Sequence, residues 1–297
     1  LVGSEMCIRD SVKLQPPVPV DILIINGCEC EPYLTSDYRV MIERTERVVK
    51  GMEVLRKILG VEKVIVAIED NKREAVNKFS PFASEKTGIA ELKTKYPQGA
   101  EKILIKKVTG RDVPEGKLPF DAGVIVSNVS TCVAVYQAVY ERTPIIKRVV
   151  TVSGEGCIKP GNYEIRIGTP LKDIIRHCFS SPFPSSRFQV KMGGGIMGMV
   201  QYDMNAPVIK GTNGIIVTKT PDIEPDRDRT CIKCGRCVNA CPMGLYPLYY
   251  VLHSQGNSPQ KIKEYNVTSC VECGCCEYVC PSKISILDVI RNAKLCL

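Results

Sequence analysis

The sequence predicts an α/β domain with a parallel sheet, then a small β-rich module, then a helix-rich domain that binds metal through cysteine. Three observations carry this prediction. Short apolar runs that look like buried strands alternate with helical patterns over the first half of the chain. From about residue 147 the pattern changes to short strands and turns. Near the C-terminus, eight of the sixteen cysteines fall in two matching runs.

The first domain contains four apolar runs that look like buried strands, at 20–25, 63–68, 102–105 and 123–127. Helical spacing predicts helices at about 36–59, capped by Gly60, and at 130–140. Strands separated by helices form a parallel sheet, and ligands bind at the carboxyl ends of such strands. Two polar segments fall there, at 26–32 and 128–131. The second segment begins a helix, and the free N–H groups at the start of a helix favour a phosphate. The residue spacing by itself is explained more simply by an ordinary capped helix beside a polar loop.

A glycine-rich stretch marks the β-rich module. Residues 191–198 contain the spacing G-x-G-x-x-G after a strand-like segment at 188–192, and a helix is predicted at 171–178. A dinucleotide-binding fingerprint needs a helix directly after the glycines and an acidic residue about 20 positions later. No helical pattern follows here, and Pro207 comes instead. The glycines therefore predict tight turns packed beside another surface.

Both cysteine runs have the form C-x2-C-x2-C-x3-C-P, which holds cubane [4Fe–4S] clusters in bacterial ferredoxins. Three closely spaced thiolates bind one cube, and the fourth cysteine of the run ligates the other cube. The sequence therefore predicts two clusters with crossed ligand sets. They are Cys231, Cys234, Cys237 and Cys280 for one, and Cys270, Cys273, Cys276 and Cys241 for the other. Cys275 is left as a neighbouring free thiol.

Composition limits the alternatives. Two zinc sites would also use C-x2-C, but they have no need of the repeated C-x3-C-P. The clustering of the cysteines argues against a disulfide scaffold. The formal charge of +8 treats all cysteines as neutral, and two oxidised clusters would lower it to about +4. No basic stripe with interleaved aromatics is present, so nucleic acid is not an expected partner, and no apolar run approaches the roughly 20 residues of a membrane span.

Several further segments resemble one family. They are residues 12–14, 25–35, 96–102, 108–114, 160–164 and 193–198, together with the two cysteine runs. Over about residues 12–294 the chain resembles the C subunit of the Rnf electron-transport complex, a membrane-bound ferredoxin:NAD oxidoreductase. The resemblance implies an FMN- and NADH-binding domain like the flavoprotein subunit of respiratory complex I at 12–145, a β-grasp module of SLBB type at 146–218, and a two-cluster ferredoxin-type domain at 219–297. It also implies an FMN site lined by Asn26, Glu29, Glu31, Asn128 and Thr131.

The function that this resemblance implies is electron transfer between NAD(H), FMN and two [4Fe–4S] clusters, with partner subunits coupling it to ion translocation. The expected location is the cytoplasmic face of the cell membrane, without a membrane span of its own. No catalytic side chain is predicted. Two alternatives remain open: a soluble flavin/iron–sulfur reductase of the cobalamin-reductase or proline-reductase-associated kind, and a passive two-cluster electron carrier. Genes for membrane subunits next to this one would distinguish the Rnf complex from a soluble reductase. Hydride transfer from NADH would distinguish an enzyme from a passive electron carrier.

Residues 1–11 fit nothing that follows and resemble a translated sequencing adaptor. They stand where the family has a glycine-rich loop that holds the flavin phosphate. The chain is therefore expected to be an N-terminally truncated form that keeps its clusters, binds FMN poorly and does not oxidise NADH.

Overall fold

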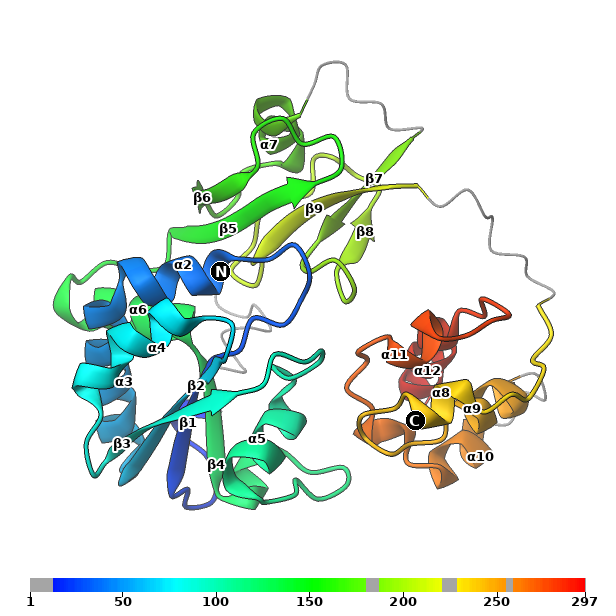
Figure 1. Ribbon diagram of the computed structural model, residues 1–297, viewed down its shortest axis with the longest axis horizontal. Coiled ribbons are helices and arrows are strands. Elements are labelled where there is room, and N and C mark those ends of the chain that lie inside the picture. Colours follow the sequence, from blue (N-terminus) through cyan, green and yellow to red (C-terminus); the bar gives the residue numbers. More distant parts are fainter. Residues whose placement is uncertain (1–12, 180–186, 221–228, 255–258, 297) are drawn as a thin grey trace. The chain divides into compact units, whose positions relative to one another are not determined.

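The computed structural model describes residues 13–179, 187–220, 229–254 and 259–296 (Figure 1). The predicted adaptor-like segment at 1–11 and most of the predicted linker at 219–230 lie outside these residues. The chain divides into two compact units. The first comprises Leu1–Val113 and Leu118–Thr220, and the second comprises Pro114–Lys117 and Pro221–Leu297.

The first sheet of unit 1 has four parallel strands in the order β3-β2-β1-β4 (Figure 1). They are β1 (Ile22–Gly27), β2 (Lys63–Glu69), β3 (Thr87–Leu92) and β4 (Val124–Asn128). Successive side chains of a strand point to opposite faces. Leu23 and Ile25 of β1 accordingly enter one core, while Ile24 enters another on the opposite face. Burial on both faces explains the continuous apolar runs that predicted these strands.

Helices cover both faces of this sheet. Their bounds are α2 (Ser36–Glu43), α3 (Thr45–Leu59), α4 (Arg73–Phe79), α5 (Glu101–Thr109) and α6 (Val129–Tyr140), with short 3-10 helices at Ser80–Phe82 and Pro119–Ala122. α3 and α6 pack closely and share the larger core, through Met52 and Cys132 among others. Leu104 and Ile105 of α5 lie in the core of the opposite face.

Two predicted elements of this domain are wrong. The single helix at 36–59 is broken at Arg44, which takes φ −128° and ψ 28° between α2 and α3. The apolar positions keep helical spacing across this one-residue break, so the pattern does not reveal it. The run at 102–105, predicted as a strand, is the first half of α5. The third strand is Thr87–Leu92, an edge strand whose residues are mostly half-exposed and therefore carry no apolar run.

The second sheet of unit 1 is mixed, with the strand order β6-β5-β9-β7-β8. Its elements are β5 (Lys147–Gly154), β6 (Gly161–Arg166), α7 (Leu171–Cys178), β7 (Phe188–Met192), β8 (Met199–Gln201) and β9 (Gly214–Lys219). β5 and β9 are parallel and the other pairs antiparallel. The apolar face of α7 packs into the core of this sheet through Leu171, Ile174 and Ile175. The predicted helix at 171–178 and strand at 188–192 are both confirmed.

The glycine-rich stretch forms the turn between β7 and β8. A Cβ atom built on Gly194 would lie 2.4 Å from the carboxylate of Glu31, and one on Gly195 would lie 3.1 Å from the ring of Tyr33. Only glycine permits this close approach of the turn to the segment after β1. The prediction of tight turns packed against another surface is therefore confirmed, and strand β8 follows the turn instead of a helix.

Unit 2 is helical. Its elements are α8 (Arg236–Asn239), α9 (Pro247–Ser254), α10 (Pro259–Glu264), a 3-10 helix at Val267–Ser269, α11 (Cys275–Tyr278) and α12 (Ile286–Leu295). Tyr250 is fully buried at the centre, and its hydroxyl donates to the carbonyl oxygen of Tyr265 at 2.7 Å. Ile286 and Ile290 of α12 pack into the same core. Within the described residues, no helix of either unit has the length and apolar character needed to cross a membrane.

The close packing of α3 on α6 gives a stability prediction. A Cβ atom on Gly51 would lie 1.9 Å from the carbonyl oxygen of Cys132. Overpacking of a core costs about 1–3 kcal/mol, and a clash with a backbone atom at this distance falls at the upper end, about 3 kcal/mol, against a gain of about 1 kcal/mol in helix propensity. We therefore expect Gly51→Ala to lower the free energy of unfolding by about 2 kcal/mol, measured by urea titration followed by circular dichroism.

The matched control for this experiment is Gly88→Ala in β3, where a Cβ atom meets no other atom within 4 Å. A change within about 0.5 kcal/mol is expected there. Equal effects of the two substitutions would contradict the close contact between the helices.

Candidate functional site

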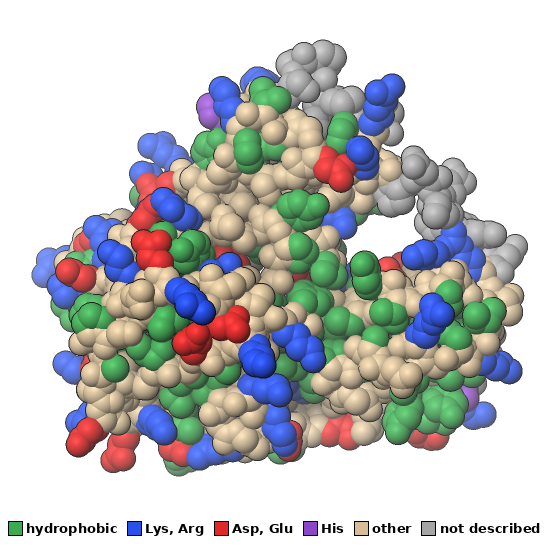
Figure 2. All heavy atoms as spheres, viewed as in Figure 1, with side chains coloured by type: hydrophobic (Ala, Val, Ile, Leu, Met, Phe, Trp, Pro, Cys, Tyr) green, Lys and Arg blue, Asp and Glu red, His purple; other side chains and the backbone are tan. Residues whose placement is uncertain are grey.

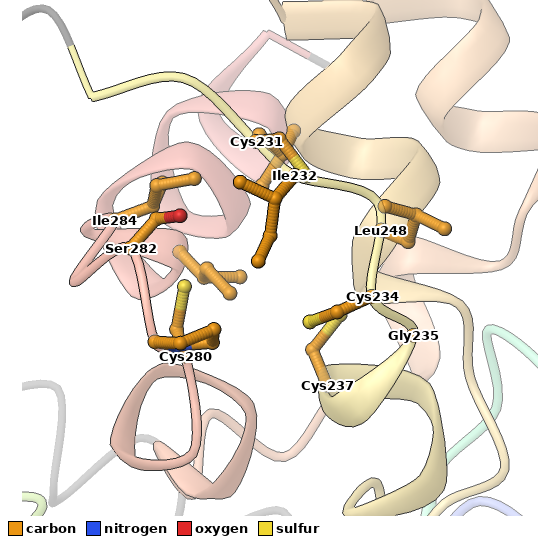
Figure 3. A pocket seen from close by; sticks show the side chains of 12 residues that line it. Cys231, Ile232, Cys234, Gly235, Cys237, Leu248, Cys280, Ser282 and Ile284 are labelled. Carbon is orange, nitrogen blue, oxygen red and sulfur yellow. The ribbon is translucent and has the colours of Figure 1, made fainter.

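The first candidate site is a cavity between the two cysteine runs of unit 2 (Figure 3). Its lining includes three cysteines of the first run and one of the second, namely Cys231, Cys234, Cys237 and Cys280. The sulfur atoms of Cys234, Cys237 and Cys280 point into the space between the two segments (Figure 3). The cavity encloses about 350 Å³, part of it open to solvent. The structure thus brings together the crossed set that the spacing predicts.

Local backbone geometry explains why three cysteines of one run converge. Lys233 and Gly235 both have positive φ, 57° and 72°. The resulting turn directs the backbone N–H of Lys233 to the sulfur of Cys231 at 3.4 Å. Helix α8 begins directly after Gly235 and carries Cys237 in its first turn. Consecutive N–H groups in such a turn favour a negatively charged group, as an iron-bound thiolate is.

The second run repeats this geometry. Glu272 and Gly274 have φ of 54° and 76°, and the N–H of Glu272 donates to the sulfur of Cys270 at 3.4 Å. Helix α11 then begins directly after Gly274. Apolar residues close the first cavity, among them Leu248 and Ile284.

The second predicted set is Cys241, Cys270, Cys273 and Cys276. Burial, followed by the neighbouring thiolates of Cys270, Cys273 and Cys241, raises the pKa of Cys276 to about 12. Burial also raises the pKa of Cys273 to about 12, with Cys275 and Cys241 contributing. Metal binding therefore has to displace protons from these thiols, so that cluster assembly and folding are coupled.

The cysteines of the two sets are spread apart. Among the residues that the structure describes, no three His, Cys, Asp or Glu side chains converge closely enough for a single metal ion. Each thiolate of a [4Fe–4S] cube binds a different iron, so the donors stand around the cube and do not meet at one point. The set that lines the first cavity fits that requirement. Cys275 begins α11, and its side chain lies beside that of Cys273.

The second candidate site lies at the carboxyl ends of β1 and β4, where Asn26 and Asn128 are neighbours in register. The side-chain amide of Asn26 donates to the carbonyl oxygen of Gly99 at 2.9 Å and accepts from the N–H of Cys28 at 3.0 Å. Asn128 caps α6, because its side-chain oxygen accepts from the N–H of Ser130 at 2.8 Å. Both asparagines therefore fix the backbone at the strand ends.

Glu29 joins the same site. Its buried carboxylate accepts hydrogen bonds from the N–H groups of Asp37 and Tyr38, at 2.9 and 3.1 Å, at the start of α2. Burial, followed by the nearby carboxylate of Asp37, raises the pKa of Glu29 to about 7, against the opposite effect of the two N–H groups. Asp37 in turn accepts from the side chains of Asn128 and Ser130 at 2.7 and 2.9 Å. A hydrogen-bond network thus links β1, α2 and α6.

Glu31 and Thr131 have different surroundings. The carboxylate of Glu31 accepts from the N–H groups of Ile196 and Met197, both at 3.0 Å, so it binds the glycine turn of the second sheet. Thr131 lies in the first turn of α6 and lines a largely apolar cavity of about 690 Å³. Of the five predicted residues, three therefore lie together at the strand ends, namely Asn26, Glu29 and Asn128. Glu31 instead contacts the glycine turn, and Thr131 lines the apolar cavity.

Sequence reasoning missed several polar groups at these strand ends. The ammonium of Lys13 donates to the carbonyl oxygen of Val126 at 2.9 Å and to the carboxylate of Glu101 at 2.6 Å. The side-chain nitrogen of Gln98 and both carboxylate oxygens of Glu69 are buried, with no hydrogen-bond partner among the described residues. Gln98 and Glu101 lie in the segment 96–102, which resembles the family, but the sequence analysis assigned that segment no role. Glu69, the last residue of β2, gave no signal. Such unpaired buried groups fit a polar ring bound at this edge.

Three family models match the chain. They are the Nuo51 FMN-binding domain over residues 9–137, the SLBB domain over 149–200 and the 4Fe-4S dicluster domain over 230–284. The first corresponds to the parallel-sheet domain, the second to the mixed sheet and the third to the two cysteine runs. Fold and site together define a protein with an FMN-binding domain and two [4Fe–4S] clusters.

Curated relatives show which proteins of this class the chain is similar to. The chain is 47% identical over 287 residues to the C subunit of the proton-translocating ferredoxin:NAD(+) oxidoreductase complex of Clostridium ljungdahlii, and the match covers 95% of this chain and 62% of that protein. It is 40% identical over 296 residues to the C subunit of the Na(+)-translocating ferredoxin:NAD(+) oxidoreductase complex of Acetobacterium woodii, covering 99% of this chain and 66% of that protein. The chain belongs to the family formed by the C subunits of ion-translocating ferredoxin:NAD oxidoreductases. It spans less than two thirds of the length of these two relatives.

Solved structures agree on the fold. An NAD+-reducing [NiFe]-hydrogenase in the H2-reduced state aligns with a TM-score of 0.60 at 18% identity, covering 98% of this chain and 57% of that one. The air-oxidised state gives a TM-score of 0.55 at 20% identity, covering 73% and 43%. At this level of identity the likeness concerns the fold alone.

The raised pKa of Glu29 predicts a pH dependence of stability. Because the folded pKa of about 7 exceeds the ordinary value of 4.5, the folded state binds a proton more tightly than the unfolded state does. This contribution to stability is complete below about pH 4.5 and is lost as the pH rises through 7. We therefore expect wild type to lose stability relative to Glu29→Gln as the pH rises from 5 to 8. Hydrogen exchange of the amides of α2 measures this difference. Glu46→Gln, an exposed site on α3, is the control, and a pH-independent difference for Glu29→Gln would contradict the raised pKa.

The crossed cysteine sets predict which cluster each substitution removes. Cys280→Ala should damage the cluster in the cavity of Cys231, and Cys241→Ala should damage the cluster held by Cys270 and its neighbours. Electron paramagnetic resonance of the reduced variants assigns the loss. Cys275→Ala, the control, should keep both signals. If Cys241→Ala removed the cluster of its own run, the crossed assignment would be wrong.

Proposed function

We propose that the protein to which this sequence belongs is the electron-transferring C subunit of an ion-translocating ferredoxin:NAD oxidoreductase complex, and that the chain as given supplies its two clusters. In this proposal electrons pass between NAD(H), FMN and two [4Fe–4S] clusters. Other subunits of the Rnf complex, membrane-embedded and peripheral, couple the transfer to ion movement. The chain works at the cytoplasmic face of the membrane. The observation that best supports the proposal is the convergence of Cys231, Cys234 and Cys237 with Cys280 of the other run on one cavity.

The eight predicted cysteines are the proposed cluster ligands, in the crossed sets given above. The N–H groups of Lys233 and Glu272 donate to the sulfurs of Cys231 and Cys270, and hydrogen bonds to cluster sulfurs raise reduction potentials. The apolar walls around the first cavity limit access of water to the ligands. We assign the two-cluster domain to 219–297, the SLBB-type module to 146–218 and the FMN/NADH domain to 12–145.

FMN is proposed to bind at the carboxyl ends of β1 and β4. When bound, FMN takes up a hydride and releases its two electrons singly, as one-electron clusters require. Asn26 and Asn128 hold the strand-end loops in place, and Lys13 supplies a positive charge there. Glu29 can hold or release a proton near neutral pH because its pKa is about 7. Glu31 fixes the turn at residues 193–198 beside these loops, and Thr131 completes the proposed lining.

The direct test is the metal content of the anaerobically reconstituted chain. Two cubes with four ligands each predict about eight irons and about eight acid-labile sulfides per chain, and reductive titration should take up about two electrons. Iron and sulfide assays with a coulometric titration measure these quantities. Two zinc ions without labile sulfide would contradict the proposal.

A further inference from the structure

The two cysteine runs have nearly the same local structure, so they can be compared position by position. The residue before the second cysteine of each run has a positive φ, 57° for Lys233 and 54° for Glu272. Its backbone N–H donates to the sulfur of the first cysteine at 3.4 Å in both runs. A glycine with positive φ follows, and a short helix begins directly after it. The two cysteine sets therefore have the same kind of backbone support.

The charges within the two runs are opposite in sign. The first run contains Lys233 and Arg236 and no acidic side chain. The second run contains Glu272 and Glu277 and no basic side chain. Because Lys233 and Glu272 occupy the same position of the same turn, they place opposite charges at matched points beside the two cysteine sets.

Residues outside the runs reduce this contrast without removing it. Arg291 and Lys294 form ion pairs with Glu272 at 3.2 and 2.7 Å, so two cations match the two carboxylates of the second run. Lys283 lines a shallow groove together with Cys280, and it adds positive charge beside the first set. The first set therefore keeps an excess of positive charge over the second.

Solvent exposure differs between the two sets as well. Cys234, the second cysteine of the first run, is exposed, whereas its counterpart Cys273 is buried. On the face drawn in Figure 2, basic and acidic side chains are interspersed, and no extended patch of a single charge appears there. The contrast between the two sets thus lies in the residues next to the ligands.

These differences bear on the reduction potential of an iron–sulfur cluster, which depends on cluster type, net charge, hydrogen bonds to the sulfurs and solvent exposure. The spacing of the ligands makes the two clusters the same type. Reduction adds one negative charge, which nearby cations and water stabilise and nearby carboxylates oppose. Charge and exposure therefore both raise the potential of the first set relative to the second.

One hydrogen bond acts in the opposite direction. The N–H of Leu245 donates to the sulfur of Cys241, a member of the second set, at 3.4 Å. A single N–H dipole has a weaker effect than the opposite full charges of Lys233 and Glu272 at matched positions. The charges are therefore expected to decide which potential is higher.

We propose that Lys233 and Glu272 give the two proposed clusters unequal reduction potentials, the higher one belonging to the set that lines the first cavity. The inference rests on the proposed function, since it needs a cluster in each cysteine set. The first electron supplied by a one-electron reductant then stays at the first set, and the second electron enters the other set at a lower potential. Each step oxidises the reductant by one electron and reduces one cluster by one, and no bond or proton is transferred.

The test measures both potentials by electron paramagnetic resonance during a reductive titration of the full chain with clusters reconstituted. Lys233→Glu introduces the residue that the second run carries at the same positive φ, so the turn should tolerate it. Glu272→Gln is the reciprocal variant. Lys233→Arg keeps the charge, and Lys263→Glu makes the same charge change at an exposed position of α10, outside both runs. Iron and sulfide content is compared with that of wild type in every variant.

We expect wild type to be reduced in two separate steps. Lys233→Glu should lower the higher potential by about tenfold in the reduction equilibrium, which is about 59 mV for one electron, and leave the lower potential nearly unchanged. Glu272→Gln should raise the lower potential. Lys233→Arg and Lys263→Glu should change neither equilibrium by more than about twofold, because the first keeps the charge and the second is screened by solvent.

Several results would overturn the proposal. They are a single reduction step in wild type, a shift of the lower potential by Lys233→Glu, an equal shift caused by Lys263→Glu, and the absence of any shift in both Lys233→Glu and Glu272→Gln. Failure of wild type to assemble two clusters would instead contradict the proposed function.

Discussion

The first cavity of unit 2 depends on one constraint: three cysteines of the first run must converge with one cysteine of the second run. The first cavity therefore exists only when Cys280 lies opposite Cys231, Cys234 and Cys237. This requires helices α8 and α11 to be in contact, as they are, and the buried Tyr250 and Ile290 fill the core beneath them. The raised pKa values of Cys273 and Cys276 further make the folded domain and its metal mutually dependent, because bound iron removes the cost of charging these thiols.

The cysteine-lined cavity could be predicted from the sequence because its determinants are local. Ligand spacing, the positive-φ glycine and the short helix that follows all fall within each run, and the two runs are alike. Strands β1, β2 and β4 were also predictable, since burial on both faces leaves a continuous apolar run. The edge strand Thr87–Leu92 was missed because exposure on one side removes that signal. The run at 102–105 belongs to α5, whose Leu104 and Ile105 face the sheet at helical spacing.

The site at the carboxyl ends of β1 and β4 was only partly predictable. Asn26 and Asn128 follow predicted strands, so topology alone placed them together. Glu31 contacts the turn at residues 193–198, and Lys13 reaches Val126 and Glu101. Pairs so distant in sequence leave no periodic signal, and the unpaired state of Gln98 and Glu69 depends on packing that only the structure shows. The glycines at residues 193–198 predicted a tight turn packed against another surface, but they did not indicate that Glu31 lies on that surface.

The central claim is that two clusters occupy crossed cysteine sets. Anomalous diffraction at the iron absorption edge, from crystals of the anaerobically reconstituted chain, tests it most directly. The account predicts two separate iron centres, one enclosed by Cys231, Cys234, Cys237 and Cys280 and the other by Cys241, Cys270, Cys273 and Cys276. A centre enclosed by the four cysteines of a single run, or a single metal ion in place of a cluster, would contradict it.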